Sequence, residues 1–259
     1  MTGVQTCALP IYFGWLNIDR LRRDGVDTSA IAVLDDAVTG SAFVTYTETG
    51  ERDFIFNIAN SASGRLSESS ITESVLADCT WFHVMGSSLF SPEITAAVRK
   101  AIGLVKRRGG IISFDPNIRP EILSSPGMRE ALRSILEQTD VFLPSGDEVT
   151  LLVDAQTEAE AIEPLLALGI REIVVKHGSA GCTYYDHSCR LDVPAFAVRE
   201  VDPTGAGDCF CATYVACREQ GKPIDHSLRY ACASGAMAVT RKGPMEGTAS
   251  FAELDTLIG

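Results

Sequence analysis

The sequence predicts an α/β protein in which a doubly wound, mostly parallel sheet is flanked by helices and carries a small β appendage. From residue 80 onward, short apolar strands alternate with amphipathic helices, the pattern of a parallel sheet with helical crossovers. Before residue 60, apolar and polar residues alternate on both sides of "ETGER", which is typical of a β-hairpin. We place this hairpin at about residues 38–60.

The elements after residue 80 follow in a regular order. "WFHVMG" predicts a strand, and Ser91 is placed to cap a helix that ends near Arg108. "GIISFD", "VFLP" and "REIVVK" predict further strands. The sequence predicts the intervening helices at 127–138, 146–153 and 157–168. An antiparallel hairpin at 181–198 and helices within 208–259 complete the prediction.

Composition limits the class of protein and of partner. The 259 residues are 46% hydrophobic, enough for one domain with a sizeable core. A formal net charge of −12 argues against nucleic acids and anionic membranes as partners. The eight cysteines form no CxxC pair, and no apolar run has membrane-spanning length. We therefore expect a cytoplasmic protein that acts on small molecules.

Polar or glycine-rich segments follow the predicted strands. They read "MGSS", "FDPNIRP", "PSGDE" and "KHGSAG". Parallel sheets bind ligands beyond the carboxyl ends of their strands. The sequence therefore predicts a cleft at this edge.

The segment "DPTGAGDCF" combines two glycines with an acidic residue at the start of a predicted helix. The amides of Gly205, Ala206 and Gly207 suit an anion, because the first turn of a helix has unpaired N–H groups. Asp208 beside them suits proton transfer from a hydroxyl during phosphoryl transfer. Taken alone, the motif favours a simpler interpretation, in which Asp208 is an ordinary first-turn charge. A Rossmann fingerprint fails at Phe210, and no P-loop is present.

The wider sequence resembles the ribokinase-like (PfkB-type) family of carbohydrate kinases. "DPTGAGDCFCATYVA" is similar to the family's C-terminal signature, and "KHGSAG", "TRKG", "FDPNIRPEIL" and "GDE" occur in the matching order. The similarity covers residues 12–259. It implies a ribokinase-like fold, phosphorylation of a sugar by ATP with Mg²⁺, and a lid formed by the hairpin at 38–60.

The resemblance also implies roles for individual residues. Asp208 would be the general base, and the amides of 205–207 would form the anion hole for the transferring phosphate. Glu148 would position Mg²⁺ through water, although Ser145 replaces the asparagine that the family has there. The nucleotide would be bound by Lys176, Gly178, Ser179 and Gly181. A monovalent cation such as K⁺ would be bound by Asp202, Thr204, Ala238, Arg241 and Gly243.

Asn57, Asn117 and Arg119 match sugar-side positions of the family. Arg119 is equally consistent with a surface arginine paired with Glu121. Phe56 and Asn57 stand where kinases of 2-keto-3-deoxygluconate carry Tyr-Arg-type residues. Because this chain lacks that cation, the case for an acidic sugar is weaker. We therefore expect a neutral ketohexose, such as tagatose or fructose, to be phosphorylated at its 6-position. The alternatives are a 2-keto-3-deoxygluconate kinase and a non-catalytic nucleotide- or sugar-binding relic.

The first eleven residues, "MTGVQTCALPI", have no counterpart in the family pattern. We interpret residues 1–11 as an artefactual segment and 12–259 as a kinase domain that lacks its first strand and helix. Because the lid often contributes to a dimer interface in this family, the resemblance also suggests a homodimer.

Overall fold

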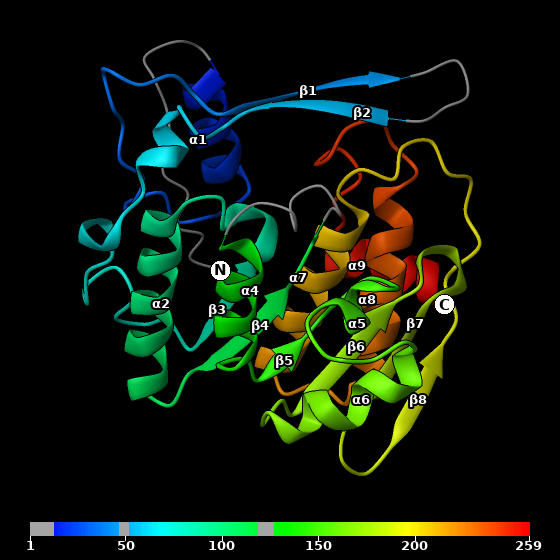
Figure 1. The fold of residues 1–259 in the computed structure, drawn as a ribbon. Coiled ribbons are helices and arrows are strands. Elements are labelled where there is room, and N and C mark those ends of the chain that lie inside the picture. Colours follow the sequence, from blue (N-terminus) through cyan, green and yellow to red (C-terminus); the bar gives the residue numbers. More distant parts are fainter. Residues whose placement is uncertain (1–12, 47–51, 119–126) are drawn as a thin grey trace. The chain divides into compact units, whose positions relative to one another are not determined.

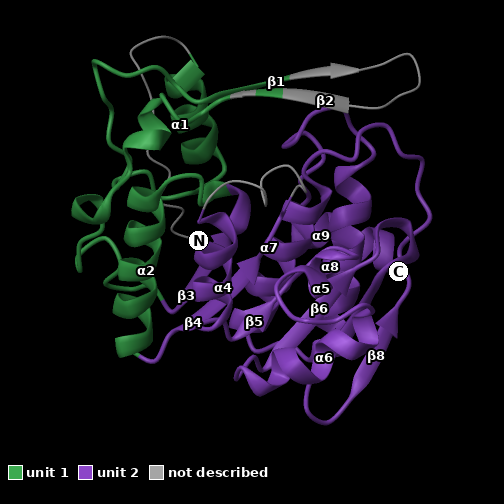
Figure 2. Cartoon of the chain, in the orientation of Figure 1, with its two compact units in different colours: residues 1–79, 88–108 green, residues 80–87, 109–259 purple. Residues whose placement is uncertain are grey.

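A computed structural model describes residues 13–46, 52–118 and 127–259. The chain forms two compact units, each with most of its contacts inside itself (Figure 2). Unit 1 comprises residues 1–79 and 88–108, and unit 2 comprises residues 80–87 and 109–259. Each unit is described by itself below. The proposed division into residues 1–11 and a kinase domain stays a prediction, because residues 1–12 lie outside the described part.

Unit 1 contains the predicted hairpin and the first predicted helix. Strands β1 (Ser41–Tyr46) and β2 (Arg52–Asn57) pair antiparallel, which confirms the hairpin. Helix α1 (Phe13–Arg23) precedes them, and helix α2 (Pro92–Arg107) ends the unit. The Ile94 amide donates to the Ser91 hydroxyl at 3.2 Å, so Ser91 caps α2 as the sequence predicts.

Unit 2 is built on a six-stranded sheet with the order β3-β4-β5-β6-β7-β8. The first four strands are parallel, whereas β7 and β8 are antiparallel, so the sheet is mixed and mostly parallel. The strands are β3 (Trp81–Met85), β4 (Ile111–Asp115), β5 (Val141–Phe142), β6 (Glu172–Lys176), β7 (Cys182–Tyr185) and β8 (Arg190–Val193).

Helices cover both faces of this sheet. Figure 1 shows α4, α5 and α6 on one face and α7 and α8 on the other, as a doubly wound sheet requires. The helices of unit 2 are α4 (Met128–Leu136), α5 (Glu148–Leu151), α6 (Glu158–Ala167), α7 (Ala206–Glu219), α8 (Ile224–Ala238) and α9 (Phe251–Ile258).

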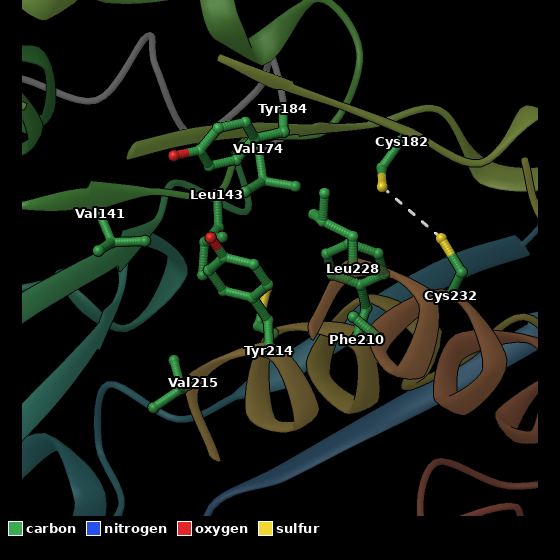
Figure 3. Close-up of a cluster of buried hydrophobic side chains, with 12 residues drawn as sticks. Val141, Leu143, Val174, Cys182, Tyr184, Phe210, Tyr214, Val215, Leu228 and Cys232 are labelled. Atoms are coloured by element: carbon green, nitrogen blue, oxygen red, sulfur yellow. Dashed lines mark hydrogen bonds between the residues drawn. The ribbon is translucent and has the colours of Figure 1, made fainter. Parts of the chain in front are cut away.

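The core of unit 2 follows from the two-residue period of its strands. Phe114 of β4 packs on Phe142 of β5 with ring centroids 5.8 Å apart, while the next residue, Asp115, points to the opposite face. On that face the apolar core joins α7 and α8 to the sheet through fully buried Tyr214 and Leu228 (Figure 3). Asp115 thus enters a largely apolar layer, where a charge requires a partner.

Candidate active site

The candidate site lies in unit 2, where the carboxyl ends of β4 and β6 meet the first turn of α7. The segment before α7 turns sharply at Gly205, whose φ of +85° is left-handed. A Cβ atom on Gly205 would lie 2.3 Å from the carbonyl oxygen of Pro244. Only glycine combines a left-handed φ with so close an approach to Pro244 without strain. The start of α7 therefore requires glycine at position 205.

The first turn of α7 presents the amides predicted to form the anion hole. First-turn amides have no acceptor within their own helix. The Ala206 amide donates to the Pro203 carbonyl over a long 3.3 Å, which closes the turn before the helix. The geometry fits an anion hole, and the role of residues 205–207 stays a prediction until a phosphate analogue is bound.

Asp208 lies in the same first turn and its side chain is exposed. Among the described residues, no side chain makes an ion pair or hydrogen bond with its carboxylate. The surrounding protein nevertheless raises the pKa of Asp208 by burial, and Asp115 raises it further while Lys176 lowers it. Asp208 is therefore accessible to a substrate and electrostatically coupled to charges beneath the helix.

Lys176 and Asp115 form a buried ion pair at this edge of the sheet. Lys176 Nζ lies 2.6 Å from Asp115 Oδ2, and the two side chains are only 9% and 3% exposed. The Cys211 thiol of α7 donates to the same Asp115 oxygen at 3.4 Å. Lys176 was expected to contact a nucleotide, but its ammonium group is engaged inside the protein. Its nucleotide contact stays a prediction.

Glu148 connects two loops at the carboxyl ends of β4 and β5. Its carboxylate accepts the amide of Ile118 and the amide of Ser145, both at 2.7 Å. Burial raises the pKa of Glu148, and the two amide hydrogen bonds oppose this rise. Each carboxylate oxygen keeps a second lone pair. The group therefore fits the predicted binding of Mg²⁺ through water.

Asn117 is the described residue of the expected sugar-side set in unit 2. It has a left-handed φ of 42°, rare for a residue other than glycine. Its amide donates to Asp115 Oδ1 at 3.1 Å, and its side-chain nitrogen contacts Met85 Sδ at 3.3 Å. Asn57 is exposed at the end of β2 in unit 1, and Arg119 lies outside the described residues.

The predicted nucleotide loop follows β6 as a tight turn. Gly178 and Gly181 have φ values of +57° and +102°. A Cβ on Gly181 would meet the Val193 carbonyl oxygen at 2.0 Å, so the loop is held against the end of β8. Gly178 and Ser179 are exposed, whereas Gly181 is buried. The loop is exposed at Gly178 and Ser179, which is compatible with the predicted nucleotide contact.

Hydrogen bonds to the Asp202 carboxylate join three of the five residues expected at a monovalent-cation site. Asp202 Oδ1 accepts the amide and the hydroxyl of Thr204, at 3.0 and 2.7 Å, and Oδ2 accepts the Gly243 amide at 3.0 Å. The carbonyl of Ala238 packs against Gly247, and Arg241 is exposed. Among the described residues, no cluster of three or more His, Cys, Asp and Glu side chains is arranged to bind a metal.

Sequence reasoning missed Asp115, Cys211 and His83. Asp115 carried a signal, since it is an acidic residue that ends the buried strand "GIISFD". His83 of β3 carried none. Its Nδ1 lies 2.8 Å from the Ser113 hydroxyl, which also accepts the Trp81 indole N–H at 2.8 Å. The other ring nitrogen, Nε2, is buried without a hydrogen-bond partner among the described residues.

We expect His83 to make stability pH-dependent. Burial lowers its pKa from the ordinary 6.5 to about 4; the charge of Asp115 opposes this change and that of Lys176 adds to it. The unfolded chain therefore binds the His83 proton more tightly than the folded chain does. As the pH falls from 6.5 through 4, the free energy of unfolding decreases by up to about 3 kcal/mol. In urea unfolding, the stability difference between the protein and His83→Asn should shrink over this range. A difference that does not vary with pH would contradict the assignment.

A model of the pfkB family of carbohydrate kinases matches residues 12–250 of the chain. The chain belongs to this family. It is therefore a sugar kinase, and its α/β fold is the ribokinase-like fold expected from the resemblance. Within the described part of this pfkB kinase, no helix is long and apolar enough to cross a bilayer.

Individual relatives of this pfkB kinase support the assignment. Over 95% of its length it is 31% identical to fructokinase-2 of Oryza sativa subsp. japonica, covering 76% of that protein. The structure of a "putative Ribokinase II" from E. coli, in complex with ATP and Mg²⁺, has a TM-score of 0.94 and 52% identity, with 97% of this chain and 81% of that chain covered. A Vibrio cholerae fructokinase mutant with fructose, ADP and potassium bound has a TM-score of 0.87 and 26% identity, with 98% and 83% covered.

Proposed function

We propose that this pfkB kinase transfers the terminal phosphoryl group of ATP to the 6-hydroxyl of a ketohexose such as fructose or tagatose. The observation that carries the proposal is the placement of Asp208. Its carboxylate is accessible, lies in the first turn of α7, and makes no ion pair among the described residues. It is therefore available to accept a proton from a substrate hydroxyl, beside amides that can bind the transferring phosphate.

The residues around Asp208 fit the steps of the reaction. Asp208 would take the hydroxyl proton as the sugar oxygen attacks phosphorus, and the amides of 205–207 would bind the phosphoryl oxygens. Glu148, fixed by two amides, would hold water on Mg²⁺, which when bound neutralises charge on the donor phosphates. The loop at 178–181 would bind the nucleotide, and the Asp202 loop would bind K⁺, as suggested by the potassium-bound V. cholerae relative.

Two observations support a ketohexose as the acceptor. The curated relatives of the chain at about 30% identity include fructokinases of several plants, and fructose is a ketohexose. In the structure, Asn117 is fixed in a left-handed conformation by Asp115. A side chain held in this way is suited to recognising one arrangement of hydroxyl groups. The E. coli relative leaves a pentose as the second candidate.

A panel of sugars tests the proposal. ADP formation would be measured with fructose, tagatose, ribose and 2-keto-3-deoxygluconate under identical ATP and Mg²⁺ concentrations. We expect kcat/KM for a ketohexose to exceed that for the others by about 10-fold or more, the discrimination expected of a site that hydrogen-bonds specific hydroxyls. Phosphorus NMR of the product would locate the phosphate. Strong turnover of the acid or of ribose, without turnover of fructose or tagatose, would refute the ketohexose.

A further inference from the structure

The buried pair of Lys176 and Asp115 is not explained by stability. Its atoms are 2.6 Å apart, and the two residues come from strands separated by β5 in the sheet. Removing two charges from water is costly, and a buried pair is commonly no more stable than well-packed apolar residues of the same size. Its presence in a mainly apolar layer therefore calls for another role.

The position of the ammonium group suggests that role. A Cβ atom built on Gly207 would lie 3.8 Å from Lys176 Nζ, so the charge lies directly beneath the first turn of α7. Nζ is also 3.4 Å from the sulfur of Cys211, one turn further along the same helix. The N-terminus of a helix already carries a partial positive charge. Lys176 adds a full charge from below, where little water screens it.

Asp115 holds this charge in place and connects it to the sugar-side loop. Its Oδ2 atom accepts from Lys176, and its Oδ1 atom accepts the amide of Asn117 at 3.1 Å. The pair is therefore a dipole whose positive end is close to Gly207. A substitution of either Lys176 or Asp115 should therefore affect both the anion hole at residues 205–207 and the loop of Asn117.

We propose that Lys176 is a positioning residue for phosphoryl transfer: held by Asp115 beneath residues 205–207, its ammonium group strengthens the anion hole as charge develops on the phosphoryl oxygens. Lys176 does this through the amides of α7 rather than by touching the nucleotide. The proposal rests on phosphoryl transfer at Asp208 but not on which sugar is the acceptor.

The charge states of the groups agree with this arrangement. Burial by itself lowers the pKa of Lys176, but the negative charge of Asp115 and its hydrogen bond to the ammonium group help to raise it above its ordinary value on balance. Burial raises the pKa of the Cys211 thiol well above its ordinary value, so Cys211 stays neutral and Asp115 is the effective partner. Lys176 therefore stays charged at every pH at which the enzyme works. The titratable groups that surround the pair and Asp208 are His83, Glu148, Cys209 and Cys211.

Four variants test the proposal: Lys176→Met, Lys176→Arg, Asp115→Asn and the double variant Lys176→Met/Asp115→Asn. Lys176→Met should lower kcat by about 10- to 100-fold, comparable with or smaller than the loss of one oxyanion-hole donor, and should change KM for ATP by less than about 3-fold. Lys176→Arg keeps the charge and should recover most of kcat. The double variant leaves no unpaired buried charge, so it should regain the thermal midpoint lost in Lys176→Met while its kcat stays low.

The pH dependence gives an independent readout. Lys176 lowers the pKa of Asp208 and Asp115 raises it. The acidic limb of the kcat profile should therefore move to higher pH in Lys176→Met and to lower pH in Asp115→Asn. A purely structural role predicts no such opposite shifts.

A second ion pair on α7 provides the matched control. Arg218 Nη2 lies 2.7 Å from Glu172 Oε1, and both side chains are less than one quarter exposed. Arg218 is in the last turn of the helix, at the end opposite Asp208. Arg218→Met/Glu172→Gln should alter stability and leave kcat unchanged.

Two results would overturn the proposal. One is wild-type kcat in Lys176→Met, and the other is a double variant that recovers both stability and kcat. Should Lys176→Met fail to fold, the double variant still decides. Failure of the proposed function would give a different result. In that case Asp208→Asn would keep normal turnover, whatever the Lys176 variants do.

Discussion

Asp208→Asn should lower turnover by about 10²- to 10⁴-fold, the usual contribution of a positioned general base. The substitution keeps the size of the side chain and removes its ability to take a proton from the sugar hydroxyl. The carboxylate has no ion-pair partner among the described residues, so its loss should have little effect on folding. Steady-state turnover and ATP affinity by calorimetry measure the two effects, and the ATP affinity should be almost unchanged.

Asp225 offers a matched control for this experiment. It is an exposed acidic residue in the first turn of α8, as Asp208 is in the first turn of α7. Asp225→Asn removes the same favourable charge from a helix N-terminus and should leave turnover unchanged. Near-normal turnover in Asp208→Asn, or an equal loss in both variants, would remove the base role from Asp208.

Gly205→Ala has the second largest expected effect, and Gly221→Ala is its control. Both glycines are left-handed, with φ of +85° and +71°, and they flank the two ends of α7. A Cβ on Gly205 would meet the Pro244 carbonyl at 2.3 Å, whereas a Cβ on Gly221 would meet nothing within 4 Å. Each variant should lose about 1–2 kcal/mol of stability from the left-handed backbone, and Gly205→Ala should lose more.

Only Gly205→Ala should affect catalysis. Relief of the clash with Pro244 moves the first turn of α7, and a displacement of about 1 Å at a catalytic group can lower turnover by about 10²-fold. Urea unfolding measures the stability of both variants, and ADP formation measures their turnover. Equal stability losses together with unchanged turnover in Gly205→Ala would show that the close approach to Pro244 does not position the anion hole.

Much of the fold could be predicted because its signals are local. The alternation of strands and helices after residue 80, the cap at Ser91 and the hairpins depend on residues close in sequence, and each is present in the structure. The sequence predicts helices from residue 208 onward, and the helix that contains Asp208 begins two residues earlier, at Ala206. The roles of the site residues came from resemblance to a family, because glycine and aspartate at a helix start are also common where nothing is bound.

Taken by itself, the sequence determined the family, the order of the elements and the segments at the carboxyl edge of the sheet, since these depend on composition, period and motif. Only the tertiary structure decided that Lys176 turns inward to Asp115, 61 residues away, and that Cys211 joins them from 96 residues away. It also decided that Gly205 approaches Pro244 and that His83 is buried beside Ser113. The physical reason is that a buried charge takes its partner from whichever strand or helix packs beside it, and local sequence patterns do not encode that neighbour.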